Sequence, residues 1–380
     1  MSTLRRVETF TYRCPIAIPV RTSFGTMTER AGVFVRVEDD TGAHGWGEIW
    51  CNFPAASAEH RARVLDTVVA PMVLGRDVSE PAALWDESER GLHILRVQSG
   101  DAGALSAAAA GLDLALHDMR ARRLGVPLWR ALGGSDGGSV RAYASGINPG
   151  PSAVDTVAAA RAAGFRAFKV KLGFGAEADI ATIRPVAAGL GAGEALMVDI
   201  NQGWGVAEAC AMAARLREFP LGWIEEPLVA DRPVWEWSQV AAAAGVRLAA
   251  GENVRGALEF QQAIESGTLG VIQPDCAKWG GATANLRVGR AALAAGLSYC
   301  PHFLGGAIGL IHSLHLLAAV RGPGLLEVDV NRNPLREALL EGLFPVIDGA
   351  IALPDGPGLG FEPEVARLAA HLTLRTERLA

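Results

Sequence analysis

Charged residues end successive short apolar runs in the middle of this 380-residue chain. In chain order these residues are Lys169 and Lys171, Asp199, Glu225, and Glu252. Each run is aliphatic or β-branched and is followed by a longer, often alanine-rich segment of helical period, which predicts a buried parallel strand and then a helix. A strand that serves only the core needs no charge at its end, so these positions are candidates for chemistry.

The spacing of the three carboxylates predicts that they meet. Asp199 and Glu225 are 26 residues apart, and Glu225 and Glu252 are 27 residues apart. Each interval fits one strand, one helix and two short loops, so we expect the three groups at one height on neighbouring strands. Carboxylates this close repel one another unless a cation lies between them. A hard divalent ion with oxygen ligands, Mg²⁺ first, is the simplest resident.

Two lysines precede the carboxylates on one predicted strand. Lys169 and Lys171 alternate with Val170, so both side chains are expected to face the interior. Each lowers the pKa of the other and a nearby cation lowers both further, so one of them is expected to be a neutral amine that acts as a general base. Asn201, two residues after Asp199, is expected to face the same cation.

A histidine and two further acids end the later runs. Asp275 and His302 are 27 residues apart, which is again one strand and helix repeat. This spacing predicts a carboxylate that orients an imidazole and favours its protonated form. Glu327, on the eighth run, is a candidate to donate or accept a hydrogen bond at the same rim. His312 and His315 have no third ligand nearby in sequence and are interpreted as helix packing residues.

The elements that would position these residues form a repeating pattern. Helical segments separate eight short apolar runs, and the repeat of roughly 25 to 30 residues is that of a parallel barrel. The predicted strands are 140–144, 167–172, 195–201, 223–226, 247–252, 271–274, 298–302 and 325–328. The expected fold class is therefore α/β, with a barrel of the TIM type.

The first third of the chain has a different pattern. Strands and then helices are predicted there, at 6–17, 33–38 and 43–49, and at 58–73, 81–91 and 102–124, respectively. The strands would form a three-strand meander, and the turn-rich segment 18–30 predicts a mobile loop.

The glycine-rich stretch 131–138 predicts the boundary between the two units. We expect an α+β capping domain at 1–134 and the barrel at 135–350. The segment from about 351 to 380 begins with several prolines and glycines and is expected to pack back on the capping domain.

Composition argues against several classes of partner. The net charge is −6 and Lys and Arg are scattered, which disfavours nucleic acid and anionic membranes. The five cysteines show no CxxC spacing and the N-terminus has no signal-peptide core, so we expect reduced thiols in a cytoplasmic protein. The apolar segment 305–320 carries two histidines and predicts a buried helix rather than a membrane span.

Sequence motifs run through nearly the whole chain. They are Gly-Trp-Gly-Glu at 45–48, Leu-Asp-Leu-Ala-Leu-His-Asp at 112–118, Lys-x-Lys at 169–171, Asp-x-Asn at 199–201, Glu-Glu-Pro at 225–227, Gly-Glu-Asn at 251–253, Pro-Asp at 274–275 with Lys-x-Gly-Gly at 278–281, and Pro-His at 301–302. As a set they resemble the enolase superfamily and, within it, the mandelate racemase subgroup. The resemblance implies an α+β cap on a (β/α)7β barrel.

The resemblance also implies roles for individual residues. Asp199, Glu225 and Glu252 resemble the Mg²⁺ ligands of the family. Lys171 resembles the base on one face of the substrate, and Lys169 resembles the neighbour that tunes it.

On the other face, His302 with Asp275 resembles the acid/base pair. Glu327 resembles the residue that hydrogen-bonds the substrate carboxylate as it becomes an enediolate, and would do so in its protonated form. The implied reaction is Mg²⁺-dependent removal of the proton next to a carboxylate.

We favour dehydration of a sugar acid to a 2-keto-3-deoxy acid, because subgroup members with both a lysine pair and a His/Asp pair are often acid-sugar dehydratases. The candidates for substrate binding are Arg21, Thr22, Asn52, Asn201 and Lys278. Phe24, Trp50 and Phe53 would instead suit an apolar or aromatic hydroxy acid.

Two alternatives stay open. One is a racemase or epimerase that moves a proton on a 2-hydroxy acid or an amino acid derivative; the other is a metal-binding scaffold without turnover. Lys278 resembles the second base of muconate cycloisomerase and dipeptide epimerase relatives, but His302 and Glu252 depart from their pattern, which favours a structural Lys278. Family members commonly form dimers or octamers, so a homo-oligomer that takes a small carboxylate is expected.

Overall fold

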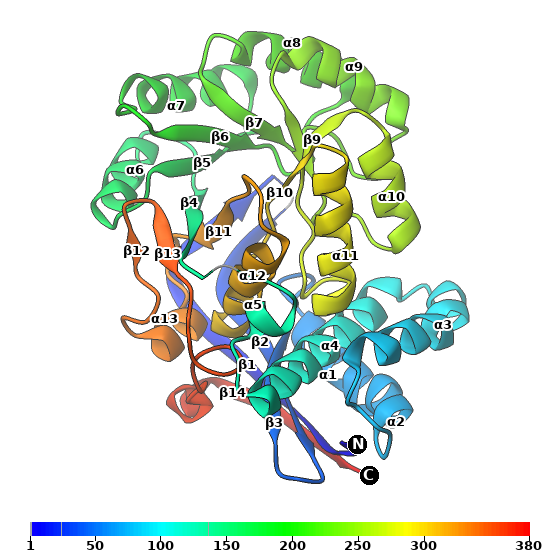
Figure 1. Cartoon of the computed structure of the whole chain (residues 1–380). Coiled ribbons are helices and arrows are strands. Elements are labelled where there is room, and N and C mark those ends of the chain that lie inside the picture. The colour runs from blue at the N-terminus through cyan, green and yellow to red at the C-terminus, as the bar shows by residue number, and fades with distance from the viewer. Residues whose placement is uncertain (1, 24, 136) are drawn as a thin grey trace.

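The computed structural model describes residues 2–23, 25–135 and 137–380, and its larger part is a barrel of eight parallel strands (Figure 1). The strands are β4 (Ser139–Ile147), β5 (Ala167–Lys171), β6 (Ala195–Asp199), β7 (Leu221–Glu225), β8 (Leu248–Ala250), β9 (Leu269–Ile272), β10 (Ser298–Tyr299) and β11 (Leu326–Asp329). Ladders connect β10 through β9, β8, β7, β6, β5 and β4 to β11. The predicted eight-strand barrel is confirmed.

Seven helices connect consecutive barrel strands and surround them. They are α6 (Ala153–Ala162), α7 (Ala176–Ala188), α8 (Val206–Leu216), α9 (Val234–Ala244), α10 (Ala257–Glu265), α11 (Gly281–Ala294) and α12 (Ala307–Val320). Every residue of α12 is buried, because it lies between the barrel and the cap. In the described part of the chain, no helix has both the length and the apolarity needed to cross a membrane.

One side chain from each strand or its flank fills the barrel interior. This cluster consists of Tyr143, Ala167, Met197, Trp223, Ala249, Val271, Cys300 and Leu325. The rings of Tyr143 and Trp223 meet edge to face with centroids 5.5 Å apart. The barrel is therefore packed solid, and the polar side chains further along the strands sit on this apolar layer.

The cap is a four-stranded antiparallel sheet covered by helices. Its strand order is β14 (Leu372–Leu379), β1 (Leu4–Thr22), β2 (Gly25–Asp39) and β3 (His44–Ile49). Its helices are α1 (Ser57–Val64), the π-helix η1 (Leu65–Val69), α2 (Ala70–Val73), α3 (Pro81–Ser99), α4 (Ala102–Leu124) and α5 (Leu128–Ala131). The chain ends lie side by side in Figure 1 because β14 pairs with β1, so the predicted meander gains a fourth strand.

The predicted mobile loop at 18–30 is wrong, because residues 18–22 belong to β1 and residues 25–30 belong to β2, and the two strands form a long hairpin. Thr22 pairs with Gly25 at its tip, and the Ser23 hydroxyl donates to the backbone oxygen of Asn201 in the barrel at 2.5 Å. The hairpin is thereby held over the mouth of the barrel. Phe24 lies outside the described residues.

The segments after β11 extend the barrel sheet and then lead the chain back to the cap. After β11 the chain forms α13 (Pro334–Leu340) and a hairpin of β12 (Val346–Ile347) and β13 (Ala350–Ala352), which pairs antiparallel with β4. A 3-10 helix, η2 (Val365–His371), then leads into β14. The division of the chain at residue 134 stays a prediction.

The predicted helix end at Gly91 is also wrong, because α3 continues to Ser99. A Cβ atom at Gly91 would lie 2.7 Å from the methyl group of Met72. This glycine serves close packing between helices, so it does not mark a helix end.

Candidate active site

Strand register places most of the predicted residues in one row at the carboxyl end of the barrel. Lys171 pairs with Asp199, Asp199 pairs with Glu225, and Glu225 pairs with Ala249. Glu252 lies three residues beyond Ala249, past the end of β8, and reaches the site from a loop. The expectation of three carboxylates at one strand height therefore holds for two of them, although all three are buried.

Lys169 lies one layer deeper and is surrounded by carboxylates. Its Nζ contacts Glu225 Oε1, lies 2.8 Å from Glu327 Oε1 and 4.0 Å from Asp199 Oδ2. Burial lowers the pKa of Lys169, but Glu225 and Glu327 outweigh it and raise the pKa well above its usual value. The expected mutual lowering of the lysine pKa values is therefore wrong for Lys169, which stays charged.

Lys171 is held by the residues that follow the next strand. Its Nζ lies 3.2 Å from Asp199 Oδ2 and donates to Asn201 Oδ1. The side-chain amide of Asn201 in turn donates to Asp199 Oδ2 at 3.0 Å. Asn201 has a φ of 47°, a left-handed conformation that asparagine tolerates better than most residues, and this turn keeps the amide beside the amine.

Glu225 and Glu226 both end in the buried site. Strand alternation predicts that they point to opposite faces, but β7 ends at Glu225 and Glu226 has a φ of 41°. The amide of Asn253 donates to Glu226 at 2.9 Å and to Glu252 at 3.1 Å. Burial raises the pKa of Glu226, and the charges of Glu252 and Asp199 raise it further, to well above its usual value.

His302 forms the predicted pair with Asp275. Nδ1 of His302 lies 2.8 Å from Asp275 Oδ2, and Nε2 lies 2.6 Å from Glu252 Oε2 and 4.0 Å from Glu327 Oε2. Burial lowers the pKa of His302, but Glu252, Glu327 and the hydrogen bond to Asp275 raise it well above its usual value. The imidazole is therefore protonated in this arrangement, as expected from the sequence.

Glu327 is a charged acceptor. It accepts from the Ser145 hydroxyl and from the backbone N–H of Phe303 at 3.1 Å, and it pairs with Lys169. Burial raises the pKa of Glu327, but the charges of Lys169 and His302 lower it to about 2. Hydrogen bonding by Glu327 to an enediolate would require a protonated carboxyl group, which this arrangement disfavours.

Lys278 reaches the site from the loop after β9. Its Nζ lies 3.1 Å from Glu252 Oε2 and 4.6 Å from the ring centroid of Trp50. An ammonium over an indole face is stabilised by the ring electrons. Lys278 therefore joins the barrel site to the cap.

A cavity of about 180 Å³ opens above these groups. It is lined by Thr22, Trp50, Asn52, Phe53, Ser145, Gly146, Lys171, Asp199, Asn201, Gln202, Glu252, Asn253, Lys278, His302, Leu304 and Glu327. The Asn52 amide already donates to the Leu304 backbone oxygen at 2.6 Å. Arg21 is exposed and does not line the cavity.

A second, larger groove of about 560 Å³ is lined by the loops after β7 and β8 and by residues of α9 and α10. It shares Gln202 and Asn253 with the cavity, but neither the lysines nor the carboxylates of the site line it. The smaller cavity, where the acids and bases converge, is the candidate active site.

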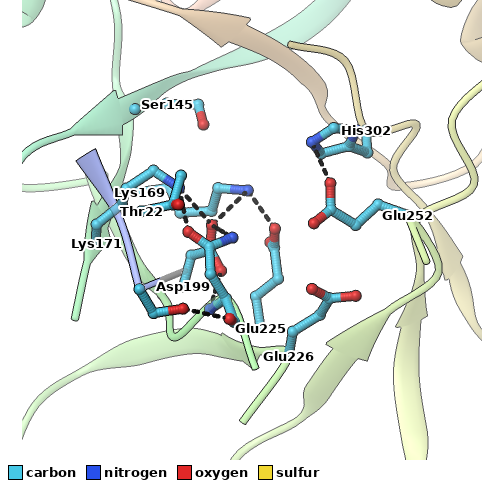
Figure 2. A network of polar contacts seen from close by, with 12 residues as sticks. Thr22, Ser145, Lys169, Lys171, Asp199, Glu225, Glu226, Glu252 and His302 are labelled. Carbon is cyan, nitrogen blue, oxygen red and sulfur yellow. Dashed lines mark hydrogen bonds and ion pairs between the residues drawn. The ribbon is translucent and has the colours of Figure 1, made fainter. Parts of the chain in front are cut away.

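The carboxylates of Asp199 and Glu225 lie between Lys171 and His302, the two candidates for proton transfer. Figure 2 shows Lys169 and Lys171 on one side of Asp199 and Glu225, and His302 with Glu252 on the other. A substrate carbon held in the cavity would thus be approached from two sides.

The donor types in the site fit Mg²⁺. Glu226 is 1% exposed, and among the described residues the lysines pair with Glu225, Asp199 and Glu252 but none pairs with Glu226. The site therefore holds more carboxyl groups, which are hard oxygen donors, than lysines to pair with them. The described part of the chain shows no preformed cluster of three metal ligands, and its carboxylates contact lysines and His302. The assignment of the metal ligands stays a proposal.

Sequence reasoning missed Ser145, Gln202, Glu226 and Asn253. Ser145 lies in β4, one residue beyond the predicted strand end at 144, whereas β4 continues to Ile147. A longer predicted strand would have included it, so the rule that found the carboxylates could have found Ser145. Glu226 and Asn253 flank two predicted ligands, but their positions depend on the turns after the strands.

Family models cover most of the chain. Residues 5–133 match the N-terminal domain of the mandelate racemase / muconate lactonizing enzyme family, and residues 152–367 match the enolase C-terminal domain-like family. D-galactarolactone cycloisomerase of Agrobacterium fabrum is 31% identical over 88% of this chain and 89% of its own. D-galactonate dehydratase of Xanthomonas axonopodis pv. citri is 30% identical over 87% and 88%.

Solved structures agree with these matches. A mandelate racemase/muconate lactonizing enzyme from Bordetella bronchiseptica RB50 is 48% identical, has a TM-score of 0.91, and the match covers 97% of this chain and 99% of that chain. An enolase from Bradyrhizobium complexed with magnesium and mandelic acid is 29% identical, with a TM-score of 0.86 and coverage of 98% and 99%. This chain therefore belongs to the mandelate racemase and muconate lactonizing enzymes of the enolase superfamily.

Proposed function

We propose that this enzyme uses Mg²⁺ to remove the proton next to a carboxylate and then dehydrates a sugar acid to a 2-keto-3-deoxy acid. The observation that carries the proposal is a buried acid cluster with Lys171 on one side and His302 on the other (Figure 2). Asp275 Oδ2 lies 2.8 Å from Nδ1 of His302. Asp199, Glu225 and Glu252 would hold the metal ion. Glu226, which Asn253 joins to Glu252, would add oxygen donors to the same site.

The chemical problem is the weak acidity of a proton whose removal adds a second negative charge to a carboxylate. Bound Mg²⁺ supplies positive charge beside that carboxylate and so favours its conversion to an enediolate. Lys171 takes the proton from C2, and the electron pair of that bond moves toward the carboxylate. The protonated His302 donates its Nε2 proton to the hydroxyl on C3, which leaves as water, and the enol tautomerises to the 2-keto acid.

The remaining charged residues orient these groups. Asp275 fixes the His302 ring through Nδ1, and Lys169 stays charged beneath the carboxylates and is available to the developing negative charge. Ser145 and Phe303 hold Glu327 near His302. Because Glu327 is ionised here, we propose that it orients polar groups and favours the imidazolium.

The cavity favours a polar substrate of small size. Thr22, Asn52 and Lys278 come from the cap and the loop after β9 and line its outer wall, where they would contact hydroxyl groups. The similarity to a D-galactonate dehydratase and a D-galactarolactone cycloisomerase supports a sugar acid as the substrate class.

A second candidate is racemisation or epimerisation by 1,1-proton transfer. It is favoured by the two proton carriers on opposite sides of the acids, because reprotonation from the far face inverts a carbon centre. Trp50 and Phe53 in the wall of the cavity would suit the apolar acids of this reaction, and the Bradyrhizobium enolase was solved with mandelic acid.

The deciding experiment is a screen of mono- and diacid sugars with Mg²⁺ in D₂O, followed for 2-keto acid release and deuterium at C2. Release of the keto acid supports dehydration. Deuterium incorporation without water loss would refute dehydration and favour racemisation. If neither occurs with any acid in metal-replete protein, and Lys171→Met leaves binding unchanged, the chain is a scaffold.

We also propose that the protein is cytoplasmic and a homo-oligomer, either a dimer or an octamer. The five cysteines are free, which fits a reducing compartment. Light scattering of the purified protein measures the oligomeric state, and a monomer at micromolar concentration would contradict the proposed homo-oligomer.

A further inference from the structure

Two cap motifs, Gly-Trp-Gly-Glu at 45–48 and the segment 112–118, contribute no side chain to the cavity. The glycines of the first motif allow β3 to press against α4. A Cβ atom at Gly45 would lie 2.3 Å from the backbone oxygen of Ala115, and one at Gly47 would lie 2.1 Å from that of Gly111. This close contact fixes where the last residue of the first motif, Glu48, points.

Glu48 reaches from the cap to the start of α12 in the barrel. Its carboxylate accepts from the backbone N–H of Gly306 at 2.5 Å and from that of Gly309 at 2.8 Å. A Cβ atom at Gly305 would lie 2.8 Å from the same carboxylate. The glycine-rich start of α12 therefore leaves room for this acid.

Asp113, in the second motif, makes the equivalent contact with α11. It accepts from the backbone N–H of Thr283 at 2.9 Å and from the Thr283 hydroxyl at 2.8 Å. A Cβ atom at Gly281, which has a φ of 52°, would lie 2.3 Å from Asp113 Oδ2. The Lys-x-Gly-Gly motif and the Asp113 motif are thus two halves of one contact.

The partially positive N-terminus of a helix faces each of these two carboxyl groups. Glu48 and Asp113 are 2% and 3% exposed, and no Lys or Arg of the described residues lies within ion-pair distance of either. Unpaired N–H groups and the helix dipole stabilise negative charge at the start of a helix. The contacts are therefore directional and involve the first turn of each helix.

These two helices follow the loops that carry one half of the site. His302 lies four residues before Gly306, and Asp275 and Lys278 lie shortly before Gly281. Lys171, in contrast, ends β5, which neither acid contacts.

We propose that Glu48 and Asp113 are positioning residues that hold the His302–Asp275 half of the site against the cap, opposite Lys171. The kinetic part of this inference rests on the proposed function. The cap would then contribute to proton transfer in addition to covering the substrate.

The variants Glu48→Gln and Asp113→Asn test the inference while keeping side-chain shape. An amide has one acceptor oxygen, so in Glu48→Gln its NH₂ group would face a backbone N–H and one contact would be lost. In Asp113→Asn the NH₂ group would face the Thr283 hydroxyl, which also contacts His117 Nε2 and could no longer donate to residue 113. Glu8→Gln is the matched control, because Glu8 is a buried cap carboxylate that pairs with Arg36 and Arg375 instead of a barrel helix.

Hydrogen exchange of the protein alone is the first measurement and needs no substrate. In Glu48→Gln we expect the amides of 303–309 to exchange about tenfold faster, with 167–171 unchanged. In Asp113→Asn the affected amides should be those of 279–285. Unchanged exchange in these loops, or a uniform increase that Glu8→Gln reproduces, would overturn the inference.

Kinetics in D₂O is the second measurement, with D-galactonate or galactarate, whichever the wild-type enzyme dehydrates. We expect kcat for dehydration to fall roughly 10- to 100-fold in both variants, while deuterium exchange by Lys171 and KM change less than about threefold. An equal loss of exchange and dehydration would show a general structural role and overturn the inference. If the wild-type enzyme processes neither acid, the proposed function fails for these substrates, and hydrogen exchange still decides the positioning.

Discussion

Replacing Asp275 by asparagine should disable the His302 half of the site and spare the Lys171 half. Oδ1 of Asp275 accepts from the backbone N–H groups of Ala277 at 2.8 Å and Lys278 at 3.1 Å, and Oδ2 faces Nδ1 of His302 at 2.8 Å. In Asp275→Asn the amide oxygen would stay with the two backbone donors, because an NH₂ group there would meet N–H groups. The NH₂ group must then donate to Nδ1 of His302.

This exchange of donor and acceptor changes the tautomer. Nδ1 becomes an acceptor, so the single proton of a neutral His302 lies on Nε2, the nitrogen that faces Glu252. Loss of the Asp275 charge also removes one of the interactions that raise the pKa of His302. A positioned acid or base contributes about 10²- to 10⁴-fold to a rate, which corresponds to about 3 to 5 kcal/mol of activation free energy.

The assay follows 2-keto acid release and deuterium at C2 in the same D₂O reaction. Dehydration should fall about 10²- to 10⁴-fold, while exchange by Lys171 stays within a few fold of wild type. Lys171→Met is the mirror control and should lose both activities, because the proton is never removed. If Asp275→Asn loses exchange as severely as dehydration, or loses neither, the assignment of His302 and Lys171 to separate steps is refuted.

Three further predictions concern stability and metal binding. Gly281→Ala should destabilise the protein by about 2 to 4 kcal/mol in urea unfolding, because its Cβ atom would clash with Asp113 at a left-handed φ. Gly296→Ala, at a φ of 77° with open space around it, should lower the unfolding free energy by less. Equal losses in the two variants would contradict the clash. Mg²⁺ at about 100 times its Kd should stabilise wild type by about 2.7 kcal/mol in thermal melts and Asp199→Asn much less, and an identical gain would contradict metal binding there. Burial, with a contribution from Asp275, raises the pKa of Glu48 to about 7. The stability that protonation of Glu48 contributes is therefore fully present below pH 4.5 and is lost as the pH rises through 7. Relative to Glu48→Gln, the wild type should lose up to about 3 kcal/mol of unfolding free energy between pH 5 and pH 8, and a pH-independent difference in urea unfolding would contradict this.

Local patterns in the chain were sufficient to predict the barrel and most residues of the site. A buried parallel strand needs a short apolar run, and the intervals between Asp199, Glu225 and Glu252 leave room for one helix each. Asp275 and His302 followed from the same reasoning, and the structure brings them within 2.8 Å. These predictions succeeded because strand period and repeat length depend on neighbours in sequence.

Other features depend on contacts between distant segments. The hairpin of β1 and β2 contacts Asn201 of the barrel through Ser23 at its tip, and β14 completes the cap sheet from the far end of the chain. Glu226 enters the site through a left-handed turn after β7. Strand alternation alone predicts the opposite direction for its side chain.

The charge states of the site were also decided by tertiary structure. The sequence by itself determined that Lys169 faces the barrel interior and that Glu327 is a candidate at the same rim. Only the fold decided that they lie 2.8 Å apart, which keeps the lysine protonated and the glutamate ionised. The physical reason is that a buried charge depends on the nearest opposite charge, and that neighbour comes from a strand 158 residues away in the chain.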